Sequence, residues 1–224
     1  NAGVIPPQPG YLEQARILAH DHGALLVFDE VITGIRVAPG GAQELYGVVP
    51  DITVVSKAMG GGYPVAAFGA SREIMEPIVD GSLFHGGVYS GNAVVMAAAE
   101  AVLDEVLRRG ESIFEQMRAV SDRLAAGLGE VLTHAGVEHV MQHVGPTLSM
   151  FLMRDGVQDI REYRDVREHC DFDAYIRLQH AMQRSGVYYH PNQFEPMFLS
   201  AAHGPEDIDE VLERFERVVA CTDF

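Results

Sequence analysis

The chain has 224 residues, of which 47% are hydrophobic, so it can bury a sizeable core in one large domain or two small ones. Its formal net charge is −16 and no basic stripe is present, which argues against nucleic acid or an anionic membrane as a partner. No apolar run reaches transmembrane length and no signal peptide is recognisable, while a start at Asn1 is what we expect for a chain that begins inside a domain.

The first half of the chain has an α/β pattern. A helix is expected over residues 11–22, where apolar residues recur on one face and Gly23 follows. Apolar runs at 24–28, 52–55 and 65–69 predict three strands. The first run is continuous and follows a helix, which is typical of a central parallel strand buried on both faces. This order of helix and strands indicates an α/β domain.

The second half begins with helices. Residues 92–109 are rich in small and apolar side chains and predict a long buried helix, and a further helix is expected over 112–128, after Gly110. Short strands then alternate with helices, at residues 137–141, 148–153, 172–185 and 205–219. The last helix is well signalled, because Pro205 suits its first position and acidic residues fill its first turn. We place a domain boundary near residue 110, with an α+β domain at 111–224.

The two cysteines point to no metal site. Cys170 and Cys221 are far apart in the sequence and have no metal-ligand spacing. We interpret them as free thiols in a reducing compartment and expect a cytoplasmic protein without a bound metal.

Two charged side chains follow apolar runs directly. Asp29 ends the first run, and Lys57 follows the second, shortly before three glycines at 60–62. Ligands of open α/β sheets bind beyond the carboxyl ends of the strands, so we expect both side chains to face one cleft. Singly, Asp29 is typical of a helix cap and Lys57 of a surface lysine. As a pair, they offer an amine for a Schiff base with an aldehyde cofactor and a carboxylate for a pyridinium nitrogen.

Longer segments around these residues resemble a known family. Residues 23–36, GALLVFDEVITGIR, are similar to the FDEVxTGxR signature of class III aminotransferases. Residues 50–64, PDITVVSKAMGGGYP, resemble the lysine motif of the same family. Other segments match further landmarks of the family or of its glutamate-1-semialdehyde aminomutase branch, at 40–44, 90–92, 186–188, 193–195 and 202–208. The resemblance covers essentially the whole chain.

The resemblance implies a pyridoxal 5′-phosphate (PLP) enzyme of fold type I. Residues 1–110 would be the C-terminal part of the PLP-binding large domain, with a mostly parallel sheet, and 111–224 the small α+β domain. Asp29 would pair with the pyridine nitrogen of PLP. Lys57 would form the Schiff base and, once displaced by substrate, shuttle a proton between the substrate Cα and the cofactor.

Other residues receive roles by the same resemblance. Val31 would pack on the cofactor ring and Gln43 would lie near its ring hydroxyl, although a core valine and an exposed loop glutamine are alternatives. Gln193 and Glu195 would face the substrate entrance, or belong to an ordinary polar loop.

One position departs from the family pattern. Two residues before Ser90 the family usually has a threonine, whose hydroxyl reaches the cofactor phosphate of the neighbouring subunit, and this chain has Val88. Backbone N–H groups at Gly87 and Val88 would then bind the phosphate, or His85 would donate to it. The same loop implies a homodimer with a shared site.

The implied function is PLP-dependent amino-group transfer between small-molecule amino acids or amines and keto acids. Glutamate-1-semialdehyde 2,1-aminomutase proper, in tetrapyrrole biosynthesis, and a non-catalytic PLP-binding relative are the alternatives. The glycine-rich phosphate loop, the stacking aromatic residue and the substrate-carboxylate site of the family are missing from the sequence. We therefore expect the 224 residues alone to be inactive.

Overall fold

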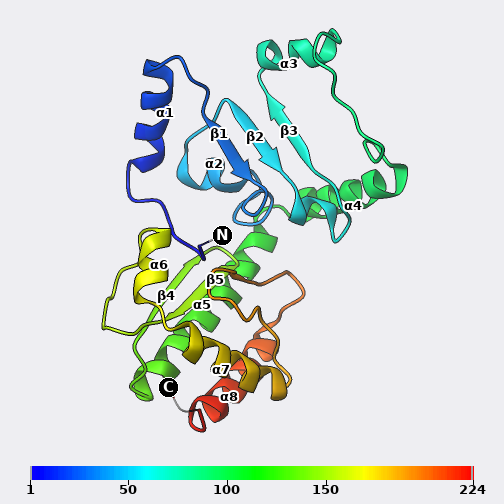
Figure 1. Cartoon of the computed structure of the whole chain (residues 1–224). Helices are drawn as coiled ribbons and strands as arrows, with labels where there is room; N and C mark the ends of the chain where they lie inside the picture. Colours follow the sequence, from blue (N-terminus) through cyan, green and yellow to red (C-terminus); the bar gives the residue numbers. More distant parts are fainter. Residues whose placement is uncertain (1, 223) are drawn as a thin grey trace. The chain divides into compact units, whose positions relative to one another are not determined.

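The structure, a computed structural model, describes residues 2–222 and 224 (Figure 1). Contacts divide the chain into two compact units. The N-terminal unit is Pro7–Ile113, and the C-terminal unit joins the residues up to Pro6 with Phe114–Phe224.

The N-terminal unit consists of helices and three short strands. Its elements are α1 Tyr11–Asp21, β1 Val27–Glu30, α2 Gly41–Tyr46, β2 Ile52–Val55, the 3₁₀ turn η1 Lys57–Gly60, β3 Ala67–Ala70, α3 Arg72–Val79 and α4 Ala93–Arg109. The expected helix at 11–22 is confirmed, and it ends where the backbone turns at Gly23, which has φ 67°. The short helices α2 and α3 were not predicted.

The three strands lie in the order β1-β2-β3 (Figure 1). β1 and β2 are parallel, whereas β3 runs antiparallel to β2. The register pairs Asp29 with Val54 and Val54 with Phe68. Residues paired directly across strands share a face of the sheet, so these three side chains form one row. The N-terminal unit is therefore α/β, as the sequence predicts.

Two expectations about burial are wrong. β1 begins at Val27 rather than at residue 24, and Val27 is 50% exposed, so this strand is not buried on both faces. The predicted buried helix at 92–109 forms as α4, but only Ala99 in it is buried. The apolar composition of these two segments indicates surfaces that favour burial. Among the described residues, only part of each surface is covered by other side chains.

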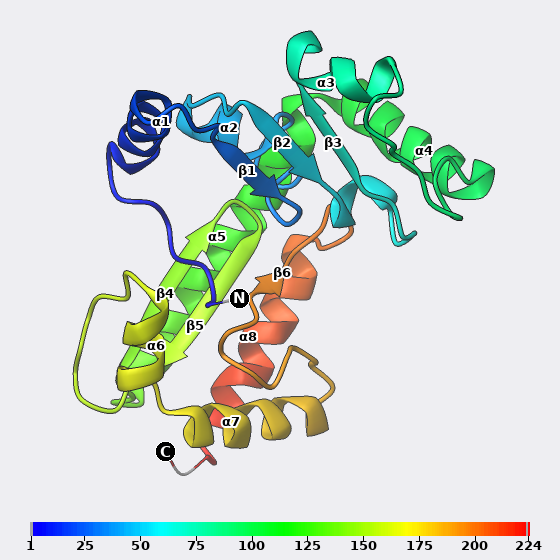
Figure 2. The same ribbon diagram turned by 45° about the horizontal axis from the view of Figure 1, so that its top comes forward.

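The C-terminal unit is built on an antiparallel sheet, as Figure 2 shows. Its elements are α5 Glu111–His134, β4 His139–Val144, β5 Thr147–Leu152, α6 Tyr163–His169, α7 Phe172–Arg184, β6 Met197–Phe198 and α8 Pro205–Val219. The strand order is β4-β5-β6 and both pairings are antiparallel. Helices and antiparallel strands are both present, as expected for an α+β domain, and α8 has the predicted bounds.

The core of the C-terminal unit lies around β5, in which every residue is buried. Leu132 of α5, Leu178 of α7 and Phe215 of α8 pack in the same cluster. A second cluster surrounds Phe151 on the same strand. The C-terminal unit therefore covers most of its own apolar surface.

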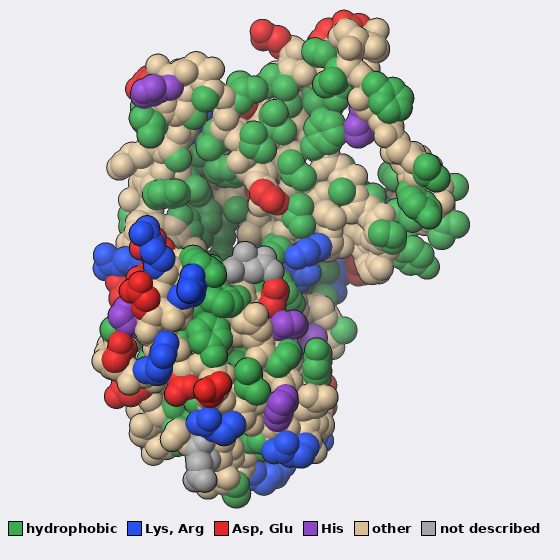
Figure 3. Space-filling view, in the orientation of Figure 1, with side chains coloured by type: hydrophobic (Ala, Val, Ile, Leu, Met, Phe, Trp, Pro, Cys, Tyr) green, Lys and Arg blue, Asp and Glu red, His purple; other side chains and the backbone are tan. Residues whose placement is uncertain are grey.

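The N-terminal unit exposes more large hydrophobic side chains than the C-terminal unit. Of the 23 exposed large hydrophobic side chains among the described residues, 18 lie between Tyr11 and Leu107. Figure 3 shows hydrophobic side chains gathered over the elements of this unit, while charged side chains are frequent over the C-terminal unit. Such contiguous apolar surface is typical of a region that packs against other polypeptide. No helix among the described residues is long and apolar enough to cross a membrane.

Candidate active site

Asp29 and Lys57 are held at the same end of two parallel strands. Asp29 is the third residue of β1, and Lys57 follows β2 after Ser56. The Asp29 side chain is on the exposed face of β1, where its Oδ1 accepts the Val31 N–H at 3.1 Å. Within the described part of the chain, neither Asp29 nor Lys57 forms an ion pair. Both groups are therefore available to a ligand at this edge.

Glu30 anchors the end of β1 from the other face. Its carboxylate is 1% exposed. It accepts the backbone N–H groups of Ala42 at 2.6 Å and Gln43 at 2.9 Å, and the hydroxyl of Thr33 at 2.8 Å. Anionic groups are stabilised by the first N–H groups of a helix, here α2. Because strand side chains alternate, holding Glu30 on one face directs Asp29 to the other.

Gln43 belongs to the Glu30 face. Its Nε2 donates to Glu30 Oε1 and to Thr53 Oγ1, each at 3.3 Å. Thr53 is paired with Phe28, so it faces away from Asp29. The structure thus does not bring Gln43 to Asp29, and it gives this amide a role in joining α2 to the sheet. Val31, partly buried, stands beside Asp29 in the turn after β1.

The backbone at Lys57 is strained. Lys57 has φ 43° and is one of two residues other than glycine with positive φ among those described. The left-handed region costs an L-residue about 1–2 kcal/mol. Such strain persists only where surrounding contacts fix the chain, and it is frequent at functional sites.

The predicted phosphate loop lies in the same unit. Val88 is 96% exposed. Within the described residues, the N–H groups of Gly87 and Val88 donate to no acceptor. The ring of His85 packs edge-on against Phe68, with centroids 5.1 Å apart. Phe68 shares a row with Asp29, so this contact holds the loop against the Asp29 face of the sheet.

Gln193 and Glu195 lie in the C-terminal unit. Gln193 is buried, with Oε1 accepting the Leu152 N–H at 2.8 Å and Nε2 donating to the Asp171 carbonyl at 2.9 Å. The oxygen and the nitrogen of the Gln193 amide are therefore both hydrogen-bonded to backbone groups. Glu195 instead lines a groove of about 540 Å³.

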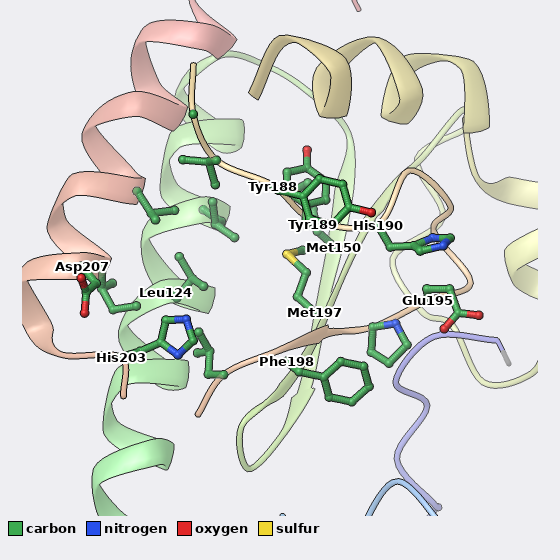
Figure 4. A pocket seen from close by; sticks show the side chains of 17 residues that line it. Leu124, Met150, Tyr188, Tyr189, His190, Glu195, Met197, Phe198, His203 and Asp207 are labelled. Atoms are coloured by element: carbon green, nitrogen blue, oxygen red, sulfur yellow. The ribbon is translucent and has the colours of Figure 1, made fainter. Parts of the chain in front are cut away.

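Figure 4 shows the side chains that line this groove. Met150 and Leu124 are among its apolar lining residues, and Glu195 and His190 are among its polar ones. Tyr189 also lines it, and burial raises the pKa of its phenol. The Tyr189 hydroxyl has no hydrogen-bond partner among the described residues. The groove can accept a partly apolar group beside a carboxylate.

The cysteines are free, and burial raises the pKa of the Cys170 thiol to about 12, so it is a thiol at neutral pH. The described residues contain no group of three or more His, Cys, Asp or Glu side chains suited to a metal ion.

Comparison with known proteins identifies the family. The aminotransferase class III model matches residues 1–219. Glutamate-1-semialdehyde 2,1-aminomutase from Salinibacter ruber is 39% identical over 98% of this chain and 49% of that protein. The chain belongs to the class III aminotransferase family, and it spans about half the length of this curated relative.

Solved structures agree. An omega-transaminase from Sphaerobacter thermophilus superposes with a TM-score of 0.86 at 28% identity, over 98% of this chain and 49% of that one. The PLP internal aldimine form of the FumI protein from a Sphingopyxis species gives 0.80 at 30% identity, over 96% and 47%. The predicted fold class, part of a PLP-dependent transferase fold, is confirmed.

Family membership implies PLP as the cofactor. The residues present fit it, because an amine and a carboxylate, neither in an ion pair among the described residues, follow the ends of adjacent parallel strands. Glu30 holds the end of β1 that carries Asp29, and the sequence alone gives it no role. The only sequence signal for Glu30 was its place beside Asp29 in the FDEV motif.

Proposed function

We propose that this chain forms part of a PLP-dependent amino-group transferase, with Lys57 and Asp29 as its catalytic residues. The single observation that carries the proposal is the placement of Asp29 and Lys57, both without ion-pair partners, at the carboxyl ends of neighbouring parallel strands. PLP, when bound, supplies an electron sink for the substrate Cα.

Each residue has a chemical task. Asp29 would keep the pyridine nitrogen of bound PLP protonated through a charge-assisted hydrogen bond. The Lys57 amine would hold the bound cofactor and, once displaced by substrate, would shuttle a proton between the substrate Cα and the cofactor. Val31 would cover one face of the ring. Because Gln43 is engaged by Glu30 and Thr53, we leave it out of this set.

The proposed substrates are small amino acids or amines with keto or aldehyde partners. The 39% identity to an aminomutase favours transfer within one molecule, between carbons 2 and 1 of glutamate 1-semialdehyde. Transfer between two molecules, as in the omega-transaminase, is the alternative.

We assign the cofactor-binding part to the N-terminal unit and a substrate-facing role to the C-terminal unit. Glu195 supports the second assignment, because its carboxylate lines a groove and can attract an ammonium group. Gln193 holds the backbone on both sides, so its role is to position the segment that carries Glu195.

We further propose a homodimer in which the loop of Gly87 and Val88 serves the cofactor phosphate of the partner. Two free N–H groups and a fully exposed valine support this role. Exposed apolar side chains nearby, Phe84 and Tyr89, are suited to a subunit contact. A cytoplasmic location is consistent with two free thiols.

Substrate assays of the complete protein test the proposal. PLP-loaded protein is given glutamate 1-semialdehyde alone, or an amine with a keto acid. Amino transfer within the single substrate supports the aminomutase, and transfer that needs both partners supports the transaminase. Failure of both, with PLP firmly bound, would support a non-catalytic relative instead.

A further inference from the structure

We propose that Ser56 is a positioning residue for Lys57, because its hydroxyl closes the turn that presents the lysine amine. The lysine turn is defined here as residues 57–65, between the end of β2 and the approach to β3. This inference rests on the proposed function of Lys57 and adds the device that fixes its direction.

The lysine turn starts with an abrupt change of backbone direction. Ser56 is extended, with φ −161° and ψ −148°, and Lys57 is left-handed, with φ 43°. The left-handed conformation is unfavourable for a lysine, so the backbone at Lys57 would leave it unless other contacts hold the turn. Any relaxation at Lys57 would swing its side chain away from the strand end.

The Ser56 hydroxyl supplies such a hold. Its Oγ donates to the carbonyl oxygen of Val65 at 2.6 Å, across the two ends of the turn. The bond is partly buried, which lessens competition from water. Within the described part of the chain, no other side chain hydrogen-bonds to residues 57–65. Because this bond uses the hydroxyl proton, Ser56 acts through the turn and not as a proton donor to substrate.

Close packing holds the middle of the turn. A Cβ added at Gly60 would lie 2.7 Å from Val65 Cγ1, and one added at Gly61 would lie 2.8 Å from Val102 Cγ2 of α4. The glycines thus let the backbone press against two valines. These contacts fix the back of the turn, but they do not join its two ends. The β2–β3 ladder ends at the Val55–Ala67 pair, and beyond it the Ser56–Val65 hydrogen bond is the side-chain link between the two ends among the described residues.

Substitutions in the complete protein test the inference. Ser56→Ala removes the bond and Ser56→Thr keeps a hydroxyl. Ser112→Ala is the matched control, because Ser112 Oγ makes a similar bond to the Arg109 carbonyl at 2.7 Å outside the turn. The first readout is amide hydrogen exchange of residues 57–65 without PLP. The second is the PLP dissociation constant, measured from visible absorbance.

We expect Ser56→Ala to speed exchange in the lysine turn and to weaken PLP binding, each by about two- to tenfold, as the loss of one hydrogen bond predicts. Ser56→Thr should restore both values and Ser112→Ala should change neither. Unchanged exchange in Ser56→Ala, or equal loosening in both Ser56 variants, would overturn the inference. Exchange in β5 reports whether each variant is folded.

The outcome is separable from that of the proposed function. Exchange without PLP tests the Ser56 contact whether or not the cofactor binds Lys57. If the wild-type protein does not attach PLP to Lys57, the proposed function fails even when the turn loosens as expected. If PLP attaches but the Ser56 variants match the wild type, only the positioning role fails.

Discussion

The carboxylate of Glu30 accepts the backbone N–H of Ala42 at 2.6 Å, which joins the end of β1 to the first turn of α2. Glu30 is 1% exposed, while its neighbour Asp29 faces solvent. Glu30 is thus a buried acid with a structural role, and the adjacent Asp29, which we propose as the cofactor-binding acid, lies on the opposite face of the strand. The position of Asp29 depends on this anchor.

Replacing Glu30 should loosen the start of α2. Glu30→Ala leaves the N–H groups of Ala42 and Gln43 without their acceptor, at a cost of about 2–3 kcal/mol. Amide exchange at these two residues should quicken correspondingly. The matched control is Glu13→Ala, since Glu13 is an exposed carboxylate in the first turn of α1. Equal effects of the two substitutions would contradict an anchoring role for Glu30.

Much of the secondary structure could be predicted because its signals are local. Helix α8 has the expected bounds, with Pro205 at its first position and apolar residues on one face. The strand β1 was misplaced, since Leu26 in its apolar run is engaged elsewhere. The Leu26 N–H donates to Asp51 Oδ2 at 2.7 Å, and its carbonyl accepts the Asp51 N–H. Glu30 extends the strand because α2 supplies its partners.

The candidate site was predictable only in part. Asp29 and Lys57 follow from apolar runs that end in charged residues and from the family motifs. The roles of Gln43 and Ser56 depend on partners brought close by folding, Thr53 and the Val65 carbonyl. A polar side chain in a loop does not reveal its partner in the sequence.

Restoring a hydroxyl at position 88 should not weaken PLP. If the loop of Gly87 and Val88 binds the phosphate through N–H groups, Val88→Thr adds a donor. A well-aligned bond to a charged acceptor contributes about 1.5–3 kcal/mol, or one to two decades in affinity. A PLP titration of the complete protein measures the change. Marked weakening would show that Val88 packs in an apolar environment and that the phosphate is held elsewhere.

The subunit number tests the same loop independently. A shared site requires at least a dimer at the working concentration, measured by sedimentation of the PLP-bound complete protein. Tight PLP binding by a strictly monomeric protein would rule out a loop contributed by the partner.

The pair of His169 and Asp155 should make the C-terminal unit sensitive to pH. His169 Nδ1 lies 2.8 Å from Asp155 Oδ2, and this hydrogen bond raises the pKa of His169 above its ordinary 6.5. A raised folded-state pKa stabilises the fold fully below 6.5, and the contribution is lost as the pH rises through the raised value. The pKa of Asp155 is lowered from 3.8, chiefly by the same bond, so its contribution is lost as the pH falls through the lowered value.

An NMR titration of His169 measures this coupling directly. Asp155→Asn should lower the pKa of His169. Asp159→Asn should leave it unchanged, because Asp159 belongs to the same loop but pairs with Arg161. A wild-type His169 that titrates at or below 6.5 would contradict the pairing.

The central claim is that Lys57 holds the cofactor, and borohydride reduction tests it most directly. Reduction makes a lysine–PLP bond permanent, and Lys57 is the only lysine in the 224 residues, so an adduct found by mass spectrometry on a peptide from these residues lies on Lys57. We predict a pyridoxyl adduct on Lys57 of the complete protein and no amino transfer by Lys57→Ala. An unmodified Lys57 after reduction of active, PLP-loaded protein, or wild-type turnover by Lys57→Ala, would contradict the account.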